Sequence, residues 1–492
     1  MTRSNTIFSR VMRIEPMRRQ SMISLTTTIA LTLIGFMSTM YFAHAVGESV
    51  LGAYFLFLAY FSIFNLIGDA GFGGAVVKRI SEGEEQNEFF SAFVALRVIL
   101  LTVSVSALLL ARPLLVDMDR SGMFFWLLLA LVVGVFSSSV SNGNYGSGKT
   151  GVHQTCGFLS ISGRVIFQVA AVFLGFGATG LAGGLVFGMI AGGIVGLRFL
   201  DLRFARFGMH HLKSLFSFSF WIFLAAGGSL VFSYADTVLI GYFMENADVG
   251  VYRVAFQFTT AATFTTVAMR TVLYPNMSKW SAHREYNRVR SALTKGFTYS
   301  LLLAVPVLIG GLLLGDRLLY FCYGAGFARG APVLYLLLAA QVVNVFMYLQ
   351  TMGLLALDRP KESFKVAAVA ATANILLDIT LIPVLGIAGA AMATLLTMTL
   401  NAVLAYRVLK RTIDVRLEYP SVRNILVASA VMGLFVGVYR LVVPLSSIWL
   451  TLVPVAVGAV MYGVVLLKLD RGIHDELRAM AAQMGVRLPR WL

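Results

Sequence analysis

Residues Gly143–Thr150 read GNYGSGKT, which matches the phosphate-binding pattern G-x-x-x-x-G-K-T. In that motif, glycines let backbone amides surround the phosphates between a strand and a helix. Here the match falls in a loop of about ten residues between two apolar segments, with no soluble domain to supply a magnesium-binding carboxylate. We therefore interpret it as a turn that ends a helix, in which Lys149 is a loop charge.

Two arginines lie deep inside apolar segments. Arg97 is about 13 Å, and Arg164 about 18 Å, from the start of its segment at 1.5 Å per residue. Ionisable groups at such depth are costly and are therefore candidates for function. Because a guanidinium can bind phosphate with two parallel hydrogen bonds, we predict that both arginines face a cavity and bind an anionic group. The alternative is that each is buried against a carboxylate or against helix-end carbonyls.

Five other charges are secondary candidates. Arg270 is a third candidate for binding an anionic substrate, although it lies near a helix end, where long side chains reach the interface. Asp236 and Arg253 are both near the outer side of one helical hairpin and could form an ion pair. Asp69 and Asp378 could take part in coupling to H⁺ or Na⁺, or they could cap helices.

The sequence has no Ser-His-Asp or paired-carboxylate constellation in its outer loops, so we predict no catalytic residues and no enzyme activity. The six histidines show no metal-ligand spacing. His210 and His211 are adjacent and would point about 100° apart on a helix, so we expect both on the surface. Cys156 and Cys322 are expected to be small core residues. Neither a metal site nor a cofactor is predicted.

The composition is typical of a membrane protein. Apolar residues make up 58% and charged residues 13% of the 492 residues, against about 25% charged in soluble domains. The formal net charge is +16. In a chain of this kind the basic excess indicates cytoplasmic loops and anionic membrane lipids as partners, rather than nucleic acid. The predicted fold class is an all-α, polytopic membrane protein.

Fourteen segments are long and apolar enough to cross the hydrocarbon core, which needs about 20 residues. They are roughly 22–44, 50–70, 88–111, 122–142, 152–175, 180–198, 217–244, 249–275, 296–316, 331–356, 364–383, 386–406, 423–443 and 448–467.

Loop charge gives the orientation. If the N-terminus is cytoplasmic, 30 of the 39 Lys and Arg residues fall on the inside and five fall in outside loops. Both termini are therefore predicted to be cytoplasmic. The N-terminal apolar run is too long for a cleavable signal peptide.

An internal repeat divides the chain. Val50–Tyr54 (VLGAY) recurs as Asp248–Tyr252 (DVGVY) after 198 residues, and Gly180–Gly184 (GLAGG) recurs as Gly386–Ala390 (GIAGA) after 206 residues. An even number of crossings per copy gives a parallel repeat. The predicted domains are a cytoplasmic N-terminal segment, an N-lobe, a C-lobe, an appended helix pair and a cytoplasmic tail, at 1–21, 22–205, 206–415, 416–470 and 471–492.

Glycines predict close helix packing. Six of them lie on the predicted helix 180–198: Gly183, Gly184, Gly188, Gly192, Gly193 and Gly196. Gly227 and Gly228, in the predicted helix 217–244, could pack in the same way or act as a flexible point, and we favour packing.

Several motifs together resemble one family. Ala235–Phe258 resembles the seventh-to-eighth helix signature of the polysaccharide transporter family, the oligosaccharide flippase branch of the multidrug/oligosaccharidyl-lipid/polysaccharide superfamily. Leu319–Leu338, Gly353–Lys361 and Gly386–Leu396 fit its later segments, and Asp69–Arg79 fits the end of its second helix.

The resemblance implies a V-shaped, two-lobed transporter of the plasma membrane with 14 helices in a 6 + 6 + 2 plan. By alternating access, it would move an oligosaccharide on a polyprenyl phosphate carrier from the cytoplasmic to the outer leaflet. The pyrophosphate of such a substrate agrees with the prediction for Arg97 and Arg164. Other polysaccharide assembly proteins are possible partners.

Two alternatives stay open. A multidrug/cation antiporter of the same superfamily would favour acidic cavity residues, whereas the deepest charges here are arginines. A membrane enzyme of polysaccharide assembly would favour a long outer loop with Arg and His. The longest outer loop, about 316–330, is short and lacks His.

Overall fold

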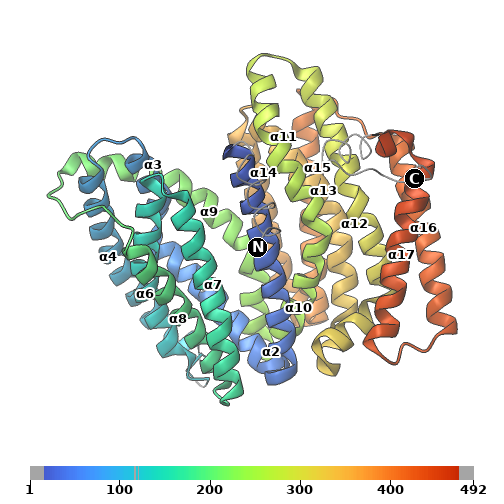
Figure 1. Cartoon of the computed structure of the whole chain (residues 1–492), viewed down its shortest axis with the longest axis horizontal. Coiled ribbons are helices and arrows are strands. Elements are labelled where there is room, and N and C mark those ends of the chain that lie inside the picture. The colour runs from blue at the N-terminus through green and yellow to red at the C-terminus, as the bar shows by residue number, and fades with distance from the viewer. Residues whose placement is uncertain (1–15, 116–117, 120, 476–492) are drawn as a thin grey trace, which may run out of the picture. The chain divides into compact units, whose positions relative to one another are not determined.

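The computed structural model of the chain describes residues 16–115, 118–119 and 121–475 (Figure 1). All regular secondary structure in these ranges is helical, as the composition predicted. The chain divides into two compact units, Met1–Val231 and Phe232–Leu492. The predicted lobe boundary at residue 205 lies in an extended connector, whereas the division between the units falls inside a helix that follows it.

Over the residues that the structure describes, the first unit contains six complete α-helices longer than two residues, one 3₁₀ helix and the first part of a seventh α-helix. They are α2 (Pro16–Asp69), α3 (Phe72–Ser81), α4 (Gln86–Ala111), η1 (Arg112–Leu114), α6 (Met123–Gly146), α7 (Thr150–Phe173), α8 (Gly177–Leu197) and the start of α9 (Met209–Phe243).

In its described residues, the second unit contains the end of α9, eight further α-helices and two 3₁₀ helices. They are α10 (Asn246–Thr259), η2 (Thr260–Thr263), α11 (Phe264–Ala282), α12 (Tyr286–Tyr323), η3 (Ala325–Gly330), α13 (Ala331–Ala356), α14 (Pro360–Leu385), α15 (Ile387–Lys410), α16 (Tyr419–Val442) and α17 (Ile448–Leu469). The last two pack on each other at one edge of this unit (Figure 1).

In the described part of the chain, 11 helices are long and apolar enough to cross a membrane. The predicted segments 22–44 and 50–70 lie together in α2, which is interrupted at Gly47 (φ 76°, ψ 178°), a conformation that suits glycine. The predicted segment 217–244 lies in α9, and 249–275 is divided between α10 and α11 by η2. The count of fourteen crossings therefore stays a prediction.

Glycines bring α8 against α7, as the sequence predicted. A Cβ on Gly188 would lie 2.3 Å from the Ser160 carbonyl oxygen, and one on Gly192 would lie 2.8 Å from the Cys156 carbonyl oxygen. Since real Cβ atoms do not approach so closely, these two positions require glycine for the helices to pack at this distance.

The second glycine prediction is not supported by the packing of α9. A Cβ on Gly227 would meet only the Leu66 side chain, at 3.8 Å, and a Cβ on Gly228 would meet nothing within 4 Å. Neither glycine is required for close helix contact. Both lie just before the division between the two units.

Candidate functional site

Arg97, on α4, is fully buried in the first unit and is paired. Its Nη2 donates to the Ser138 hydroxyl at 2.7 Å, and its Nη1 lies 3.2 Å from Asp69 Oδ1. Asp69 ends α2, and its other oxygen accepts a hydrogen bond from the Gly73 amide at 3.4 Å. Asp69, whose side chain is 26% exposed, is the carboxylate partner that the sequence left open as the alternative to a cavity-facing arginine. Asp69 both pairs with Arg97 and holds the start of α3.

Arg164 has a different environment. It lies on α7 where the glycine face of α8 approaches, and a Cβ on Gly188 would be 2.8 Å from the Arg164 Cβ. Its side chain is half-buried, and its Nε is buried without a hydrogen-bond partner among the described residues. The structure therefore places the two deep arginines in different interfaces. The Nε of each is buried without a hydrogen-bond partner among the described residues, but Arg97 is paired to an acid and Arg164 has no such ion pair there.

Arg270 lies on the exposed side of α11 in the second unit. Its Nη1 donates to the Tyr348 hydroxyl of α13 at 2.6 Å, and its guanidinium lies 5.1 Å from the centre of that ring. The contact fixes the guanidinium while leaving part of it accessible, so it can still reach an anionic group.

Two acidic side chains are buried in the second unit. Asp236 of α9 is 7% exposed and Asp378 of α14 is 0% exposed. The hydroxyl of Tyr252 donates to Asp236 Oδ2, and the Thr394 hydroxyl donates to the same oxygen at 2.8 Å. Four helices, α9, α10, α14 and α15, therefore contribute to one acidic cluster, which we define as Asp236, Tyr252, Asp378 and Thr394.

Asp378 is the unsatisfied member of the acidic cluster. Both of its carboxylate oxygens are buried and lack a hydrogen-bond partner among the described residues. It lies close enough to Asp236 for a side-chain hydrogen bond if one of the two carries a proton. Two buried carboxylates this close cannot both be ionised without a compensating positive charge. The arrangement therefore favours an added proton or cation.

Close packing of α14 and α15 builds this cluster. A Cβ on Gly389, in the repeated GIAGA motif, would lie 2.3 Å from the Leu381 carbonyl oxygen, so only glycine permits the approach. Asn374, 2% exposed, lies one turn before Asp378 on the same face of α14. It adds a buried amide one turn away from Asp378.

Arg253 was a candidate partner for Asp236. It is half-buried and within electrostatic range of that carboxylate, but its guanidinium donates to the Ser233 carbonyl at 3.0 Å. It also lies over the rings of Tyr234 and Phe256, at 5.3 and 5.4 Å from their centres. The hydrogen bond to the Ser233 carbonyl and the contacts with the two aromatic rings hold Arg253 beside the acidic cluster.

The segment Gly143–Thr150, which matches the phosphate-binding pattern, has a structural role. It spans the end of α6 and the start of α7, the turn that the sequence predicted. The Lys149 ammonium donates to the Asp201 carboxylate and to the Phe199 carbonyl. This lysine therefore binds the start of the connector, which we define as residues 198–208.

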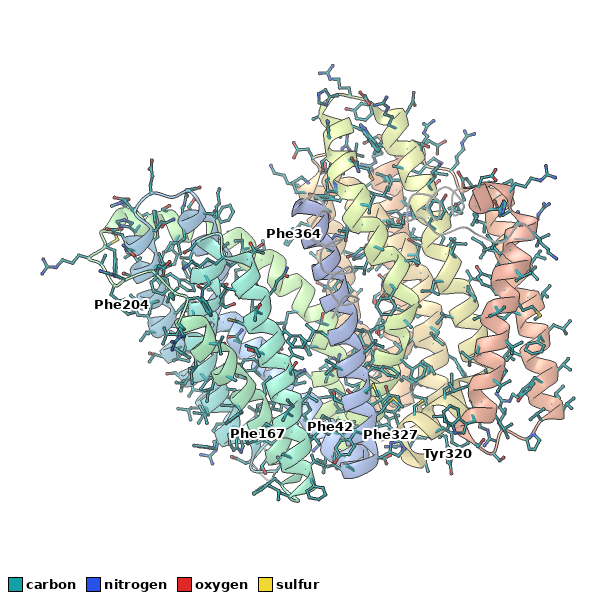
Figure 2. The ribbon with its side chains drawn as sticks, viewed as in Figure 1. Phe42, Phe167, Phe204, Tyr320, Phe327 and Phe364 are labelled. Atoms are coloured by element: carbon teal, nitrogen blue, oxygen red, sulfur yellow. The ribbon has the colours of Figure 1, made fainter. Side chains whose placement is uncertain are left out.

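Other side chains of the first unit bind the rest of the connector. The Arg203 amide donates to Asn87 Oδ1 and the Ala205 amide donates to the Ser91 hydroxyl, each at 2.8 Å. Phe204, labelled in Figure 2, belongs to this connector. Its ring centre lies 6.0 Å from that of Phe90. The connector is thus held along its length by the first unit.

Two histidines directly after the connector, at the start of α9, lie close to Glu85. The Nε2 atoms of His210 and His211 each lie 3.2 Å from Glu85 Oε2. The prediction that both histidines are on the surface is wrong for His211, which is 3% exposed because its ring packs edge-on against Phe89. The hydrogen bond from His210 lowers the pKa of the Glu85 carboxyl.

The same three residues have the donor set of a metal site, with ligand atoms within 4.8 Å of one another. However, His211 Nδ1 accepts a hydrogen bond from the Gly208 amide at 3.0 Å. In a neutral imidazole the proton then sits on Nε2, which has no free lone pair for a metal. We interpret the cluster as a hydrogen-bonded closure of the connector.

Sequence reasoning missed three members of the buried site in the second unit: Tyr252, Asn374 and Thr394. The internal repeat could have identified two of them, Tyr252 and Asn374. Tyr252 ends the repeated DVGVY motif, and Asn374 lies 206 residues after Gln168, the spacing that separates GLAGG from GIAGA. In the described residues Gln168 is itself buried and bonded to Tyr54, so the repeat marks a polar position in both units.

The fold and its buried charges define a class, the multi-pass, all-helical membrane proteins. The chain belongs to the polysaccharide biosynthesis protein family and to the lipid II flippase MurJ family, because each family model matches more than half of it, at residues 18–281 and 154–463. The resemblance drawn from the sequence motifs is thereby confirmed.

Two proteins of Haloferax volcanii are similar over nearly the whole length. One is named "probable low-salt glycan biosynthesis flippase Agl15", with 25% identity over 92% of this chain and 95% of that protein. The other is named "probable flippase AglR", with 27% identity over 94% and 98%.

Two solved structures are similar in fold. The lipid II flippase MurJ in an inward closed conformation gives a TM-score of 0.77 over 92% of this chain and 99% of that one, at 17% identity. An inward-facing multidrug resistance MATE family transporter gives 0.65 over 78% and 96%, at 14% identity. At these identities the likeness concerns the fold alone.

Proposed function

We propose that this protein is a flippase that moves a lipid-linked oligosaccharide from the cytoplasmic to the outer leaflet of the plasma membrane by alternating access, without catalysing a reaction. The observation that carries the proposal is the match over nearly the full length to two proteins named as flippases. The matched families, polysaccharide biosynthesis proteins and MurJ, agree with a glycan on a lipid carrier.

The substrate's phosphate groups need a cation, and Arg164 is the strongest candidate. Its Nε, like that of Arg97, is buried without a hydrogen-bond partner among the described residues, although a buried donor normally has one. Arg97 is already paired with Asp69, whereas Arg164 has no carboxylate partner in the described part of the chain. An anionic group would satisfy it with a charge-assisted bond. Arg270 is a second candidate because its guanidinium is exposed while Tyr348 holds it in place. Arg97 is assigned the supporting role of neutralising Asp69.

The acidic cluster supports coupling to a cation, either H⁺ or Na⁺. Asp378 is fully buried with two unsatisfied oxygens, and Asp236 already accepts two hydroxyl donors on one oxygen. Binding of one positive charge would relieve the repulsion between the two acids. Release of that charge would restore the repulsion between the two acids. Binding and release of the cation would therefore change how α9, α10, α14 and α15 pack.

The test is accumulation of lipid-linked sugar in a strain that lacks the gene and carries a variant. Arg164→Ala should block export while the protein remains abundant, and Arg164→Lys, which keeps the charge but loses the fork geometry, should be partly active. The matched control is Arg198→Ala, which removes an exposed arginine at the end of α8. Normal export by abundant Arg164→Ala protein would refute the role of this arginine.

Cytoplasmic termini belong to the same proposal and have a separate test. Cysteines placed at Ser121, Asn246 and Ser446 should react with an impermeant reagent from outside, whereas cysteines at Ser281 and Ser363 should not. External labelling at Ser281 would contradict the orientation that the loop charges predict.

A further inference from the structure

A crevice of about 580 Å³ lies in the second unit between α11 and α12, away from the acidic cluster. Its walls are mostly apolar, with Met269 and Leu273 from α11 and Leu302 from α12. Trp280 and Tyr299 also line it, and both are half-buried. A cavity with these walls suits a hydrocarbon chain better than a polar solute.

Small residues shape the crevice, and a proline interrupts the backbone donors of one of its helices. Pro275 lies inside α11, where it removes one backbone donor. Gly296 brings α12 close to α11, since a Cβ there would lie 2.9 Å from Leu273 Cδ1. Ala292, one turn before it, presents only a methyl group to the crevice. The two helices therefore touch at Gly296 while a space remains beside the contact.

One end of the crevice is positively charged. Arg288 and Lys295 line it, and both side chains are exposed. Seven residues apart, they lie on one face of α12 about 10 Å from each other along the axis. Arg288 donates to Glu285 Oε2 at 2.6 Å, so that the charged end carries two cations and one carboxylate.

The length of α12 places this end at the headgroup level. The helix has 38 residues, or about 57 Å, whereas the hydrocarbon core is about 30 Å thick. Its charged first turns therefore extend beyond the hydrocarbon, and its apolar remainder lies within it. Trp and Tyr are enriched at such interfaces. Loop charge predicts that this end is cytoplasmic, and that leaflet carries anionic lipids.

We propose that this crevice binds one anionic phospholipid of the cytoplasmic leaflet. The headgroup phosphate lies against Arg288 and Lys295, and one acyl chain follows the apolar wall from Trp280 toward Leu302. Charge complementarity at the mouth selects an anionic headgroup over a zwitterionic one. The apolar depth selects a lipid over free phosphate. This site is separate from Arg164 and from the acidic cluster, and it does not depend on the transported substrate.

Trp280 makes the test direct. A variant that keeps Trp280 and carries Phe at the other four tryptophans (Trp126, Trp221, Trp449 and Trp491) is purified in detergent and titrated with lipids whose acyl chains carry bromine. Brominated phosphatidylglycerol should quench Trp280 at concentrations at least about five-fold lower than brominated phosphatidylcholine, as expected for a net charge of one at the mouth, where Glu285 offsets one of the two cations.

Three variants in the same background refine the test. The double change Arg288→Gln with Lys295→Gln should abolish the preference for phosphatidylglycerol. Arg290→Gln should keep it, because Arg290 is exposed on the same helix but does not line the crevice. Ala292→Leu should weaken quenching by both lipids because it fills the space. Gel filtration and circular dichroism check that each variant is folded.

Several results would overturn the proposal. Absence of quenching by either lipid, or equal quenching by both in the parent protein, would exclude a selective lipid site. Displacement of phosphatidylglycerol by inorganic phosphate at matching concentration would reassign the charged end to a simple anion. Loss of the preference in Arg290→Gln would indicate a general surface-charge effect. None of these results bears on glycan export, so failure here leaves the proposed function standing.

Discussion

Tyr54 in the first unit and Tyr252 in the second end the two copies of the same repeated motif, yet their hydroxyls have opposite roles. The hydroxyl of Tyr54 accepts a hydrogen bond from the neutral Gln168 amide at 2.8 Å. The hydroxyl of Tyr252 donates to the Asp236 carboxylate. One tyrosine completes a neutral network, and the other stabilises a buried charge.

The surrounding positions differ in the same way. At the offset of 206 residues, Val172 matches Asp378 and Gly188 matches Thr394. At the offset of 198 residues, Ser38 matches Asp236. The second unit therefore has acids and a hydroxyl where the first has small or apolar residues. The repeated helices thus surround neutral side chains in the first unit and two buried acids, which favour binding of a cation, in the second.

The largest expected difference between the units is in transport. Asp378→Asn should reduce export on the order of ten-fold or more, because it removes a charge that the buried cluster needs for cation binding. Ser38→Ala, at the position that matches Asp236, should leave export unchanged, since among the described residues its hydroxyl donates to the Gly35 carbonyl of its own helix. The measurement is lipid-linked sugar accumulation at equal protein abundance. Full export by Asp378→Asn would end the coupling assignment.

The next largest effect concerns stability in the first unit. Arg97→Gln leaves Asp69 without its cation and should lower the unfolding free energy by about 3 kcal/mol. The melting temperature in detergent and the abundance in membranes report the change. Adding Asp69→Asn should restore much of the loss, because no uncompensated charge then remains. A double variant that is less stable than Arg97→Gln alone would contradict a simple ion pair.

A smaller effect separates the two tyrosines. Tyr252→Phe removes a donor to a carboxylate, a bond of about 1.5–3 kcal/mol, and should change the pH and Na⁺ dependence of export. Tyr54→Phe removes an acceptor from a neutral amide, at about 1 kcal/mol, and should leave that dependence as it was. Equal shifts in the two profiles would show that the repeat positions do not differ in function.

The smallest effect concerns the connector of the first unit. The Glu85 pKa lies below its ordinary value of 4.5 because His210 donates to the carboxylate. A lowered pKa means that the contact is present above pH 4.5 and is lost as the pH falls through the lower value. A nitroxide label at position 204 should therefore become more mobile only at acid pH, whereas Glu85→Gln should make it more mobile at neutral pH too. If the label has the same mobility at pH 7 in the parent protein and in Glu85→Gln, then Glu85 does not hold the connector in place.

The sequence predicted features that depend on patterns along the chain. Long apolar runs predicted the helices, and the glycines of the helix at 180–198 predicted close helix packing, although not that α7 is the partner. Cys156 and Cys322 are buried free thiols, as expected. Each of these properties is decided by residues that are neighbours in sequence or that share one helix face.

Pairing across helices could not be predicted in this way. Asp69 and Arg97 were considered separately, because nothing in their spacing shows that α2 and α4 bring them within 3.2 Å. Asp236 and Thr394 are 158 residues apart and meet only because α9 and α15 pack with α10 and α14. His211 was assigned to the surface because its polarity is visible in the sequence, whereas its contact with Phe89 is not.

The helix α9 belongs to both units, and this affects how the protein can be divided and made. Leu215 joins the buried core of the first unit, and the Ser219 carbonyl oxygen would lie 2.4 Å from a Cβ placed on Gly71. The first unit therefore cannot complete its packing until the ribosome has released residues well beyond the connector. If the protein is coexpressed as two fragments divided at residue 205, the first fragment lacks the part of α9 that completes its core. If it is divided after α9, the first fragment keeps that core but the second fragment lacks Asp236. Both units therefore need residues of α9, and neither division leaves two complete units.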